Sequence, residues 1–269
     1  MCAVFCILLS SIIFPTWMKT NPTLAIALIS FNEEKNIRLT LESVRTIADE
    51  IILLDHFSKD HTKEIAEELG AKVYQEEWTD FITQKNSLFD KCSSDWILNL
   101  DCDEVLTDEL RDEIKEAIQS EEFSSFYLDR KTVYLGRKLK YAWQPDWQLR
   151  LVRREAKPKW VGLVVHESIE IEGKTGRLKG ELLHYSYRDI AHHMAKTLDY
   201  SKISAEQYKL KGKKFHLSKL MLNPVIAFCR LYIFRRGFLD GIPGLIAGFS
   251  TFMYTFLKYA MLFEKSNKS

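Results

Sequence analysis

Residues 96–104 read WILNLDCDE, an apolar run that ends in a cluster of acidic residues. A run such as WILNL is typical of a buried β-strand. Alternate side chains of an extended chain share a side, so Asp101 and Asp103 can face one site. Paired carboxylates suit Mg²⁺ or Mn²⁺, especially where substrate phosphates complete the coordination. A helix N-terminus is the alternative reading of this acidic pair, because acidic residues there stabilise the helix dipole.

The chain before this stretch repeats the same pattern of an apolar strand and a polar end. Further strands are expected at 24–30 (LAIALIS), 50–55 (EIILLD) and 72–75, and helices at 36–48, 62–69, 81–92 and 109–119. Alternating strands and helices predict an α/β fold, with a mostly parallel sheet covered on both faces. Ligands bind beyond the carboxyl ends of such strands, where Asn32, Glu33 and Asp55 join the acidic pair. The sequence has no GxGxxG after the first strand and no GxxxxGK[ST], which disfavours a dinucleotide fold and excludes a P-loop.

The pattern changes from residue 123 onward. The stretches at 126–139, 147–154, 160–171 and 178–187 predict antiparallel strands rich in Arg and Lys, and residues 190–218 predict a basic helical region. We therefore divide the chain into an apolar segment or mis-assigned start (1–22), a nucleotide-sugar-binding half (23–120), an acceptor-side half (121–190) and a basic, apolar helical tail (191–269).

Composition is that of a globular protein. The 269 residues are 46% hydrophobic and 28% charged, which rules out disordered, collagen-like and coiled-coil classes. The net charge of +1 conceals a bias: 11 basic and 23 acidic residues at 18–120, but 13 and 5 at 189–269. A basic end suggests work near an anionic surface. Five scattered cysteines favour a reducing compartment.

Both ends of the chain are apolar. Residues 1–17 carry no charge, and they predict either a short membrane anchor or a natural start at Met18. Residues 237–257 contain a single charge, Asp240, which disfavours a spanning helix. Arg230, Arg235, Arg236 and Lys258 flank the apolar blocks. This pattern favours helices that lie in an anionic leaflet, and a buried helical hairpin is the alternative.

Four stretches, ISFNEEKNI (29–37), DHFSKDHT (55–62), QKN (84–86) and NLDCDE (99–104), make the first half of the chain resemble a known family. It is similar to the donor-binding half of family 2 glycosyltransferases, which are inverting enzymes of the GT-A fold. WQLRLVRR (147–154), WVGLVVHE (160–167), HYSY (184–187) and RRGFLDGIPG (235–244) narrow the resemblance. They are similar to the subgroup that adds a β-linked glucose to the inner-core heptose of bacterial lipopolysaccharide.

The resemblance implies roles for individual residues. Ser30, Asn32 and Glu33 would lie against the nucleotide of a UDP-sugar, Asp55 would accept a hydrogen bond from uracil, and Lys85 would lie near the diphosphate or base. Asp101 and Asp103 would bind the metal and the sugar nucleotide. The family loop after the second strand often reads Asp-Ser-x-Ser, whereas this chain has His56 and Phe57.

An inverting transfer needs a base that takes the proton of the acceptor hydroxyl. Glu167 is the first candidate and Asp146 the second, and an ion pair with an arginine is the alternative role for Glu167. His184 is a candidate metal ligand, because imidazole binds Mn²⁺-type metals, or else a structural residue. Trp143, Trp147 and Trp160 could stack on sugar rings or fill a core, and Arg150 could contact phosphate or lie on a solvated strand face.

Together these features predict an inverting glycosyltransferase that depends on Mg²⁺ or Mn²⁺. Its donor would be a UDP-sugar, with UDP-glucose favoured, and its acceptor a membrane-linked glycolipid such as the lipopolysaccharide inner core. The protein would lie on the cytoplasmic face of the inner membrane as a peripheral protein. A sugar-phosphate nucleotidyltransferase and a non-catalytic membrane scaffold are the alternatives. Nucleic-acid binding is not expected, because the basic residues accompany apolar helices.

Overall fold

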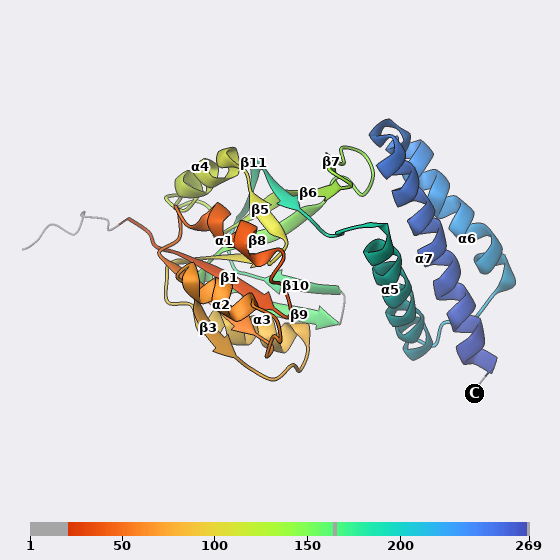
Figure 1. Ribbon diagram of the computed structural model, residues 1–269, viewed down its shortest axis with the longest axis horizontal. Helices are drawn as coiled ribbons and strands as arrows, with labels where there is room; N and C mark the ends of the chain where they lie inside the picture. The colour runs from red at the N-terminus through yellow and green to blue at the C-terminus, as the bar shows by residue number, and fades with distance from the viewer. Residues whose placement is uncertain (1–20, 164–165, 268–269) are drawn as a thin grey trace, which may run out of the picture.

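The computed structural model describes residues 21–163 and 166–267, so the expectation for the N-terminal apolar segment lies outside the described residues except at its last two positions. The described chain forms a nine-stranded mixed sheet, a separate two-stranded sheet and a group of C-terminal helices (Figure 1). The predicted α/β fold with apolar C-terminal helices is confirmed.

The first half of the chain builds a parallel block in the order β3-β2-β1-β4. Its strands are β1 (Leu24–Ser30), β2 (Glu50–Asp55), β3 (Lys72–Gln75) and β4 (Trp96–Asp101), and its helices are α1 (Ile37–Val44), α2 (Thr62–Glu68) and α3 (Phe81–Asp90). The strands are almost continuously apolar because helices cover both faces, and β1 is buried at six of its seven positions. The polar residues that follow β1, β2 and β4 therefore meet at one edge.

The second half extends this sheet beyond β4 in the order β8-β6-β11-β5. Its elements are β5 (Glu104–Leu106), α4 (Asp108–Ala117), β6 (Ser125–Tyr134), β7 (Arg137–Lys138), β8 (Trp147–Arg153) and β11 (Thr175–His184). As predicted, β8 is antiparallel to its neighbours. The expectation of an antiparallel strand is wrong for the pairing of β11 with β6, which is parallel. The intervening β9–β10 hairpin returns the chain to the edge from which β6 starts.

The hairpin of β9 (Lys159–Leu163) and β10 (His166–Glu170) forms the separate two-stranded sheet. It is held to α3 by Asn86, whose side chain donates to the carbonyl of Trp160 and accepts from its backbone N–H, at 3.0 and 2.9 Å. This clamp holds β9 against the helix that carries Lys85. Because β10 pairs with β9, Glu167 then lies 3.4 Å from Lys85.

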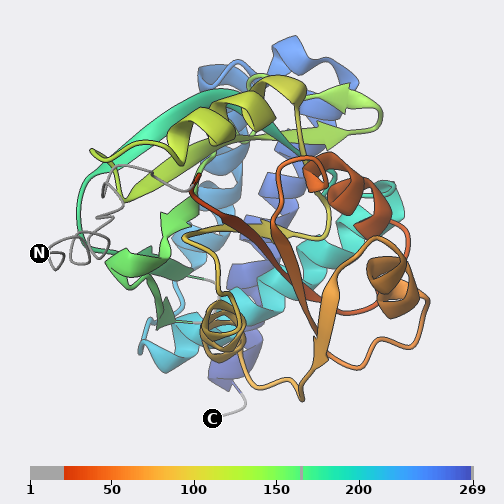
Figure 2. The ribbon, with the colours of Figure 1, turned by 90° about the vertical axis from the view of Figure 1, so that its left-hand side faces the viewer.

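The C-terminal helices are α5 (Ile190–Leu210), α6 (Leu217–Cys229) and α7 (Ile242–Asn267), with a π-helical turn (Arg230–Phe234) and a 3-10 turn (Gly237–Asp240) between the last two. They lie side by side at one end of the molecule, with α5 nearest the sheet (Figure 1). Figure 2 views the molecule from the opposite end, with the sheet in front of these helices. Two stretches, Leu217–Phe234 and Ile242–Ser266, are long and apolar enough to cross a membrane by length and composition.

Candidate active site

A cleft of about 1,070 Å³ lies at the carboxyl ends of β1 and β4. Its walls carry most of the site residues proposed from the sequence, namely Ser30, Glu33, Lys85, Asp101, Asp103, Glu167 and His184. Asn32, Asp55 and Asp146 do not line it. The topology therefore gathers side chains from both halves of the chain around the acidic pair.

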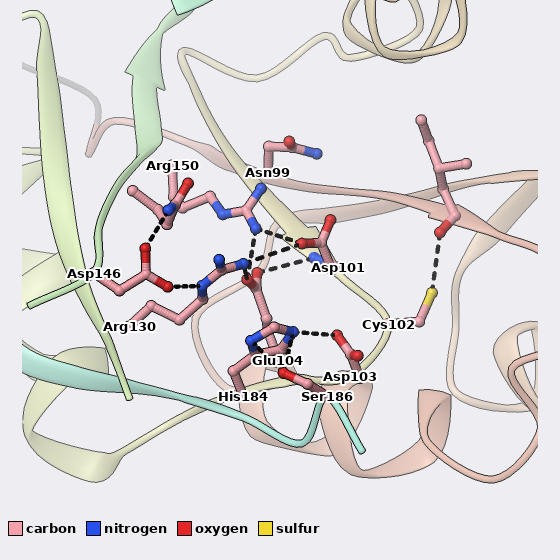
Figure 3. A network of polar contacts seen from close by, with 12 residues as sticks. Asn99, Asp101, Cys102, Asp103, Glu104, Arg130, Asp146, Arg150, His184 and Ser186 are labelled. Carbon is pink, nitrogen blue, oxygen red and sulfur yellow. Dashed lines mark hydrogen bonds and ion pairs between the residues drawn. The ribbon is translucent and has the colours of Figure 1, made fainter. Parts of the chain in front are cut away.

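The acidic pair spans the end of β4: Asp101 is the last residue of the strand, and Asp103 lies in the turn that follows it. Asp101 and Asp103 line the cleft, while the thiol of Cys102 points toward the carbonyl of Ile29, 3.2 Å away (Figure 3). Thr40 on α1 donates a hydrogen bond of 2.7 Å to the carbonyl of Cys102, which fixes the turn from beneath. The residue between the two carboxylates is thus an anchor in the core.

Asp103 faces His184 across the cleft floor. The two residues meet because β11 pairs with β5 so that His184 lies opposite Glu104, and the N–H of Tyr185 donates to the carbonyl of Asp103 at 2.9 Å. His184 Nε2 then lies 3.3 Å from Asp103 Oδ1. The hydroxyl of Ser186 lies 2.8 Å from His184 Nδ1 and orients the ring (Figure 3).

Asp101 is engaged by a buried cation. Arg150, only 3% exposed, donates to Asp101 Oδ2 and to Glu104 Oε1, both at 2.5 Å (Figure 3). Arg130 joins from β6 at 3.1 Å from Glu104 Oε1. Burial alone would raise the pKa of Asp101, but Arg150 and then Lys85 outweigh it and hold the pKa well below its ordinary value. Asp101 is therefore an anion in this site.

A divalent cation fits this donor set in part. The carboxylate of Asp103 and the imidazole of His184 are ligands that Mg²⁺ and Mn²⁺ accept, and these ions commonly take substrate phosphates as further ligands. Asp101, the third predicted ligand, points to Arg150 instead. Across the residues that the structure describes, no three His, Cys, Asp or Glu side chains are grouped as a metal site.

Glu167 lies on the opposite wall beside a lysine. Its Oε1 is 3.4 Å from Lys85 Nζ, so the ion pair foreseen for Glu167 forms with a lysine and not with an arginine. The Lys85 ammonium also lies 4.0 Å from the centre of the Trp160 ring, a cation–π contact. Burial lowers the pKa of Lys85, although the carboxylate of Asp101 opposes this shift.

The three predicted residues outside the cleft wall shape its surroundings. Asp55 is fully buried and accepts hydrogen bonds from Ser30, Ser58 and Gln75. Burial would raise its pKa, but these hydrogen bonds lower it below the ordinary value. Asn32, with a positive φ of 57°, accepts from the N–H of Lys59 at 2.8 Å. Asp146 accepts from Arg130 at 2.7 Å and from Gln148 at 2.6 Å.

Sequence reasoning missed several residues of the cleft. Arg130, Tyr187, Lys196 and Tyr200 all line it. Glu104 is fully buried beneath it, although the acidic run that contains this residue marks it as a candidate. Tyr187 belongs to the quoted HYSY motif. Arg130, Lys196 and Tyr200 carry no local signal, because only the pairing of β6 with its neighbours and the packing of α5 bring them to the cleft.

A sheet of this topology, with an acidic cleft at the carboxyl ends of its parallel strands, has the architecture of a GT-A glycosyltransferase. The model of the family described as "Glycosyl transferase family 2" matches residues 25–168. An uncharacterized glycosyltransferase of Rickettsia typhi is 31% identical over 254 residues, which cover 90% of this chain and 87% of the relative. The chain therefore belongs to glycosyltransferase family 2.

One further relative and one solved structure match over almost the same length. The lipopolysaccharide core biosynthesis glycosyltransferase LpsC of Rhizobium meliloti is 30% identical over 251 residues, covering 88% of this chain and 91% of LpsC. Among solved structures, the mannosyltransferase PcManGT from Pyrobaculum calidifontis, in complex with GDP-Man and Mn²⁺, has a TM-score of 0.54 at 9% identity. It covers 92% of this chain and 88% of its own, and it shows the shared fold.

Proposed function

We propose that this protein is an inverting hexosyltransferase that uses Mn²⁺ or Mg²⁺ and transfers glucose from UDP-glucose to the heptose of a lipopolysaccharide inner core. The observation that carries the proposal is the Asp103–His184 pair, 3.3 Å apart on the floor of a cleft that also holds Lys85 and Glu167. The relationship to LpsC supports the acceptor class.

On the donor side, Asp103 and His184 would hold the cation, and the cation supplies charge neutralisation to the departing diphosphate. Lys85 lies close enough to the same space to add a second positive charge. Ser30 and Glu33 line the wall at the end of β1, where the nucleotide would lie. Asp55 and Asn32 would act through the loop at 56–62, whose backbone and side chains they hold.

On the acceptor side, Glu167 is the base that the geometry favours. Its carboxylate lines the cleft and pairs with the ammonium of Lys85 at 3.4 Å. Asp146 instead accepts from two donors and lies outside the cleft wall. Glu167 would take the proton of the attacking hydroxyl as the bond to the sugar forms, and inversion follows from a single displacement.

The C-terminal helices would bring the cleft to the cytoplasmic leaflet of the inner membrane. Only 11% of Leu217–Phe234 is buried against the rest of the protein, although the stretch is strongly apolar. Arg230, Arg235 and Arg236 are exposed in and beside it. Apolar surface with flanking cations binds anionic leaflets, where a phosphorylated lipid-linked acceptor resides.

Thermal unfolding with UDP, with and without Mn²⁺, tests the donor side of this proposal. A ligand that binds the native state raises the melting temperature, so UDP with Mn²⁺ should stabilise the protein and UDP alone should do so weakly. Asp103→Ala should abolish the metal-dependent shift. Asp112→Ala is the matched control, because Asp112 is exposed on α4 and pairs only with Lys115.

Transfer assays then test the reaction itself. Radiolabelled UDP-glucose, UDP-galactose and UDP-N-acetylglucosamine are compared with heptose-terminated lipopolysaccharide core as acceptor, and UDP-glucose should be preferred. Stabilisation by a nucleoside triphosphate but not by UDP would instead favour a nucleotidyltransferase. A folded protein that responds to no nucleotide would indicate a non-catalytic scaffold.

A further inference from the structure

A second cavity, of about 450 Å³, lies among the C-terminal helices, beside the segments that connect them to the sheet. We call it the aromatic chamber, and its walls include Trp143 from the β7–β8 loop, Tyr187 after β11, His193, Tyr200 and Ser204 on α5, and Tyr254 on α7. Its volume is within the range of about 300–1,000 Å³ typical of ligand pockets. Neither the family relationship nor the sequence motifs assign it a role.

The chamber adjoins the cleft, and Tyr187, Tyr200 and Ile203 line both spaces. Burial, reinforced by the carboxylate of Asp103, raises the pKa of Tyr200, which places this side chain within electrostatic reach of the acidic pair. A ligand with one sugar in the chamber and the next in the cleft would pass these three shared side chains.

The chamber also adjoins a third cavity within the group of apolar helices. Leu231 and Thr251 line both the chamber and this third cavity of about 440 Å³, which lies between α6 and α7. Arg230 and Arg235 line this third cavity. Both side chains are exposed, and within the described chain neither forms an ion pair with a carboxylate. The cleft, the chamber and the third cavity are thus neighbours in a row, from the acidic pair to two cations at the helix surface.

The lining of the chamber suits a sugar ring. Tyr187 and His193 stack at 4.1 Å, and Trp143 closes the same side at 5.6 Å from the His193 ring. Aromatic faces bury the C–H surface of a ligand, while hydroxyl groups among them can bind its polar atoms. Ser204 and Tyr254 provide such hydroxyls, with their oxygens 2.7 Å apart. The chamber contains no carboxylate and no lysine or arginine among its lining residues.

We infer that the aromatic chamber binds the saccharide portion of the acceptor, and that Arg230 and Arg235 face an anionic group of the same molecule nearer its lipid. The inference rests on the proposed function and deepens it. The sugar that carries the attacking hydroxyl would lie at the junction formed by Tyr187 and Tyr200. The adjoining sugar would occupy the chamber, and phosphate on the core or on the lipid would reach the third cavity.

Tyr254→Ala tests the inference with heptose-terminated core oligosaccharide, freed of its lipid, as the acceptor. Removal of the lipid separates sugar binding from membrane binding. The acceptor KM should rise about tenfold, the loss expected for one aromatic contact, while kcat at saturating acceptor stays within about threefold. Tyr254→Phe keeps the ring and should restore most of the affinity. Leu198→Ala, at an exposed position of α5 outside the chamber, is the matched control.

Ser204→Phe is the second variant, because it fills the chamber from α5 and leaves the Tyr254 ring itself in the protein. It should raise the acceptor KM at least as much. The inference is overturned if both variants keep the acceptor KM of the wild-type protein, or if the KM for UDP-glucose rises equally. UDP binding, measured by thermal shift, distinguishes failure of the inference from failure of the proposed function. A wild-type protein that binds neither UDP nor acceptor refutes both.

Discussion

Arg150 pairs with two carboxylates that differ in their exposure to solvent. Glu104 is fully buried, whereas the side chain of Asp101 is 43% exposed at the cleft. A buried carboxylate needs a partner, since the desolvation of an unpaired charge costs several kcal/mol. By satisfying Glu104 and Asp101 together, Arg150 fixes the direction of Asp101 and leaves Asp103 as the acidic residue that faces His184.

The first prediction concerns this buried ion pair. Arg150→Met leaves Glu104 buried without its closest cation, and the free energy of unfolding should fall by about 3–5 kcal/mol. Equilibrium unfolding in urea measures the loss. The double variant Arg150→Met/Glu104→Gln removes both charges and should recover much of the stability. Equal losses in the single and double variants would show that Arg150 contributes by packing alone.

The second prediction separates the two candidate bases. Glu167→Gln should lower kcat by about 10²–10⁴-fold, because the amide takes no proton, while the stabilisation by UDP and Mn²⁺ persists. Asp146→Asn should lower kcat less than tenfold, since Asp146 itself does not line the cleft and its carboxylate is occupied by Arg130 and Gln148. Transfer assays at saturating donor measure both. A larger loss in Asp146→Asn would reverse the assignment of the base.

For single residues, the sequence predicts which side chains line the cleft better than it predicts which partners those side chains contact. Asp101, Asp103 and Glu33 follow strands, so their positions could be inferred from strand order alone. The contact between Arg150 and Asp101 could not, because it depends on the antiparallel register of β4 and β8. The hydrogen bonds that three side chains donate to Asp55 could not be predicted either, although one donor, Ser58, lies within the quoted motif DHFSKDHT.

Among the elements, the C-terminal helices are positioned in part by one charged residue, Asp240. Asp240 disfavours a spanning helix, and the structure gives it a partner. Its carboxylate accepts from the backbone N–H groups of Lys140, Tyr141 and Ala142, at 2.9, 3.0 and 2.7 Å. The turn before α7 is thereby fixed to the β7–β8 loop, which also carries Trp143. Apolar periodicity could predict these helices, but not the loop that receives them.

The third prediction concerns the docking of α5. His193 is 1% exposed, its Nδ1 lies 2.8 Å from the hydroxyl of Tyr134, and burial lowers its pKa to about 4. An unfolded histidine titrates near 6.5, so the unfolded chain binds the proton first as the pH falls. Stability from the neutral ring is complete above pH 6.5 and is lost between pH 6.5 and 4, by roughly 3 kcal/mol.

Thermal or urea unfolding between pH 7.5 and 4.5 measures this dependence. His193→Asn retains a nitrogen near the position of Nδ1 but does not titrate, so it should be less stable at pH 7.5 and show a flatter profile. His216→Asn is the control, because His216 lies before α6, away from the aromatic chamber. A variant profile as steep as that of the wild-type protein would assign the pH dependence to other groups.

For the whole molecule, the distribution of charge along the sequence predicts that the acidic part and the basic part form different regions of the structure. The acidic first half forms the parallel block, and the basic last part forms α5, α6 and α7 (Figure 1). The charge bias predicts two working surfaces. The sequence could not predict the aromatic chamber, because Trp143, Tyr187 and Tyr254 come from three separate segments.

The fourth prediction belongs to this scale, because membrane binding depends on the summed surface of α6, α7 and their turns. Exposed apolar side chains gather there, including Met221, Ile226, Phe234, Phe238, Ile242 and Phe249. The protein should co-sediment with vesicles that contain phosphatidylglycerol, more strongly than with phosphatidylcholine vesicles. Each cation near an anionic surface contributes about 1 kcal/mol, so Arg230→Gln/Arg235→Gln/Arg236→Gln should weaken binding about 100-fold.

A triple variant on the sheet-bearing part of the chain, Lys35→Gln/Lys115→Gln/Lys179→Gln, removes the same charge from exposed positions and should bind as the wild-type protein does. Salt should weaken the wild-type interaction, because screening acts on the arginines and not on the apolar contacts. Binding that is equal for both lipids and indifferent to salt would mean that apolar insertion alone holds the protein. A monodisperse protein that binds neither kind of vesicle would contradict membrane association. It would favour the alternative of a helical hairpin whose apolar face is covered by protein.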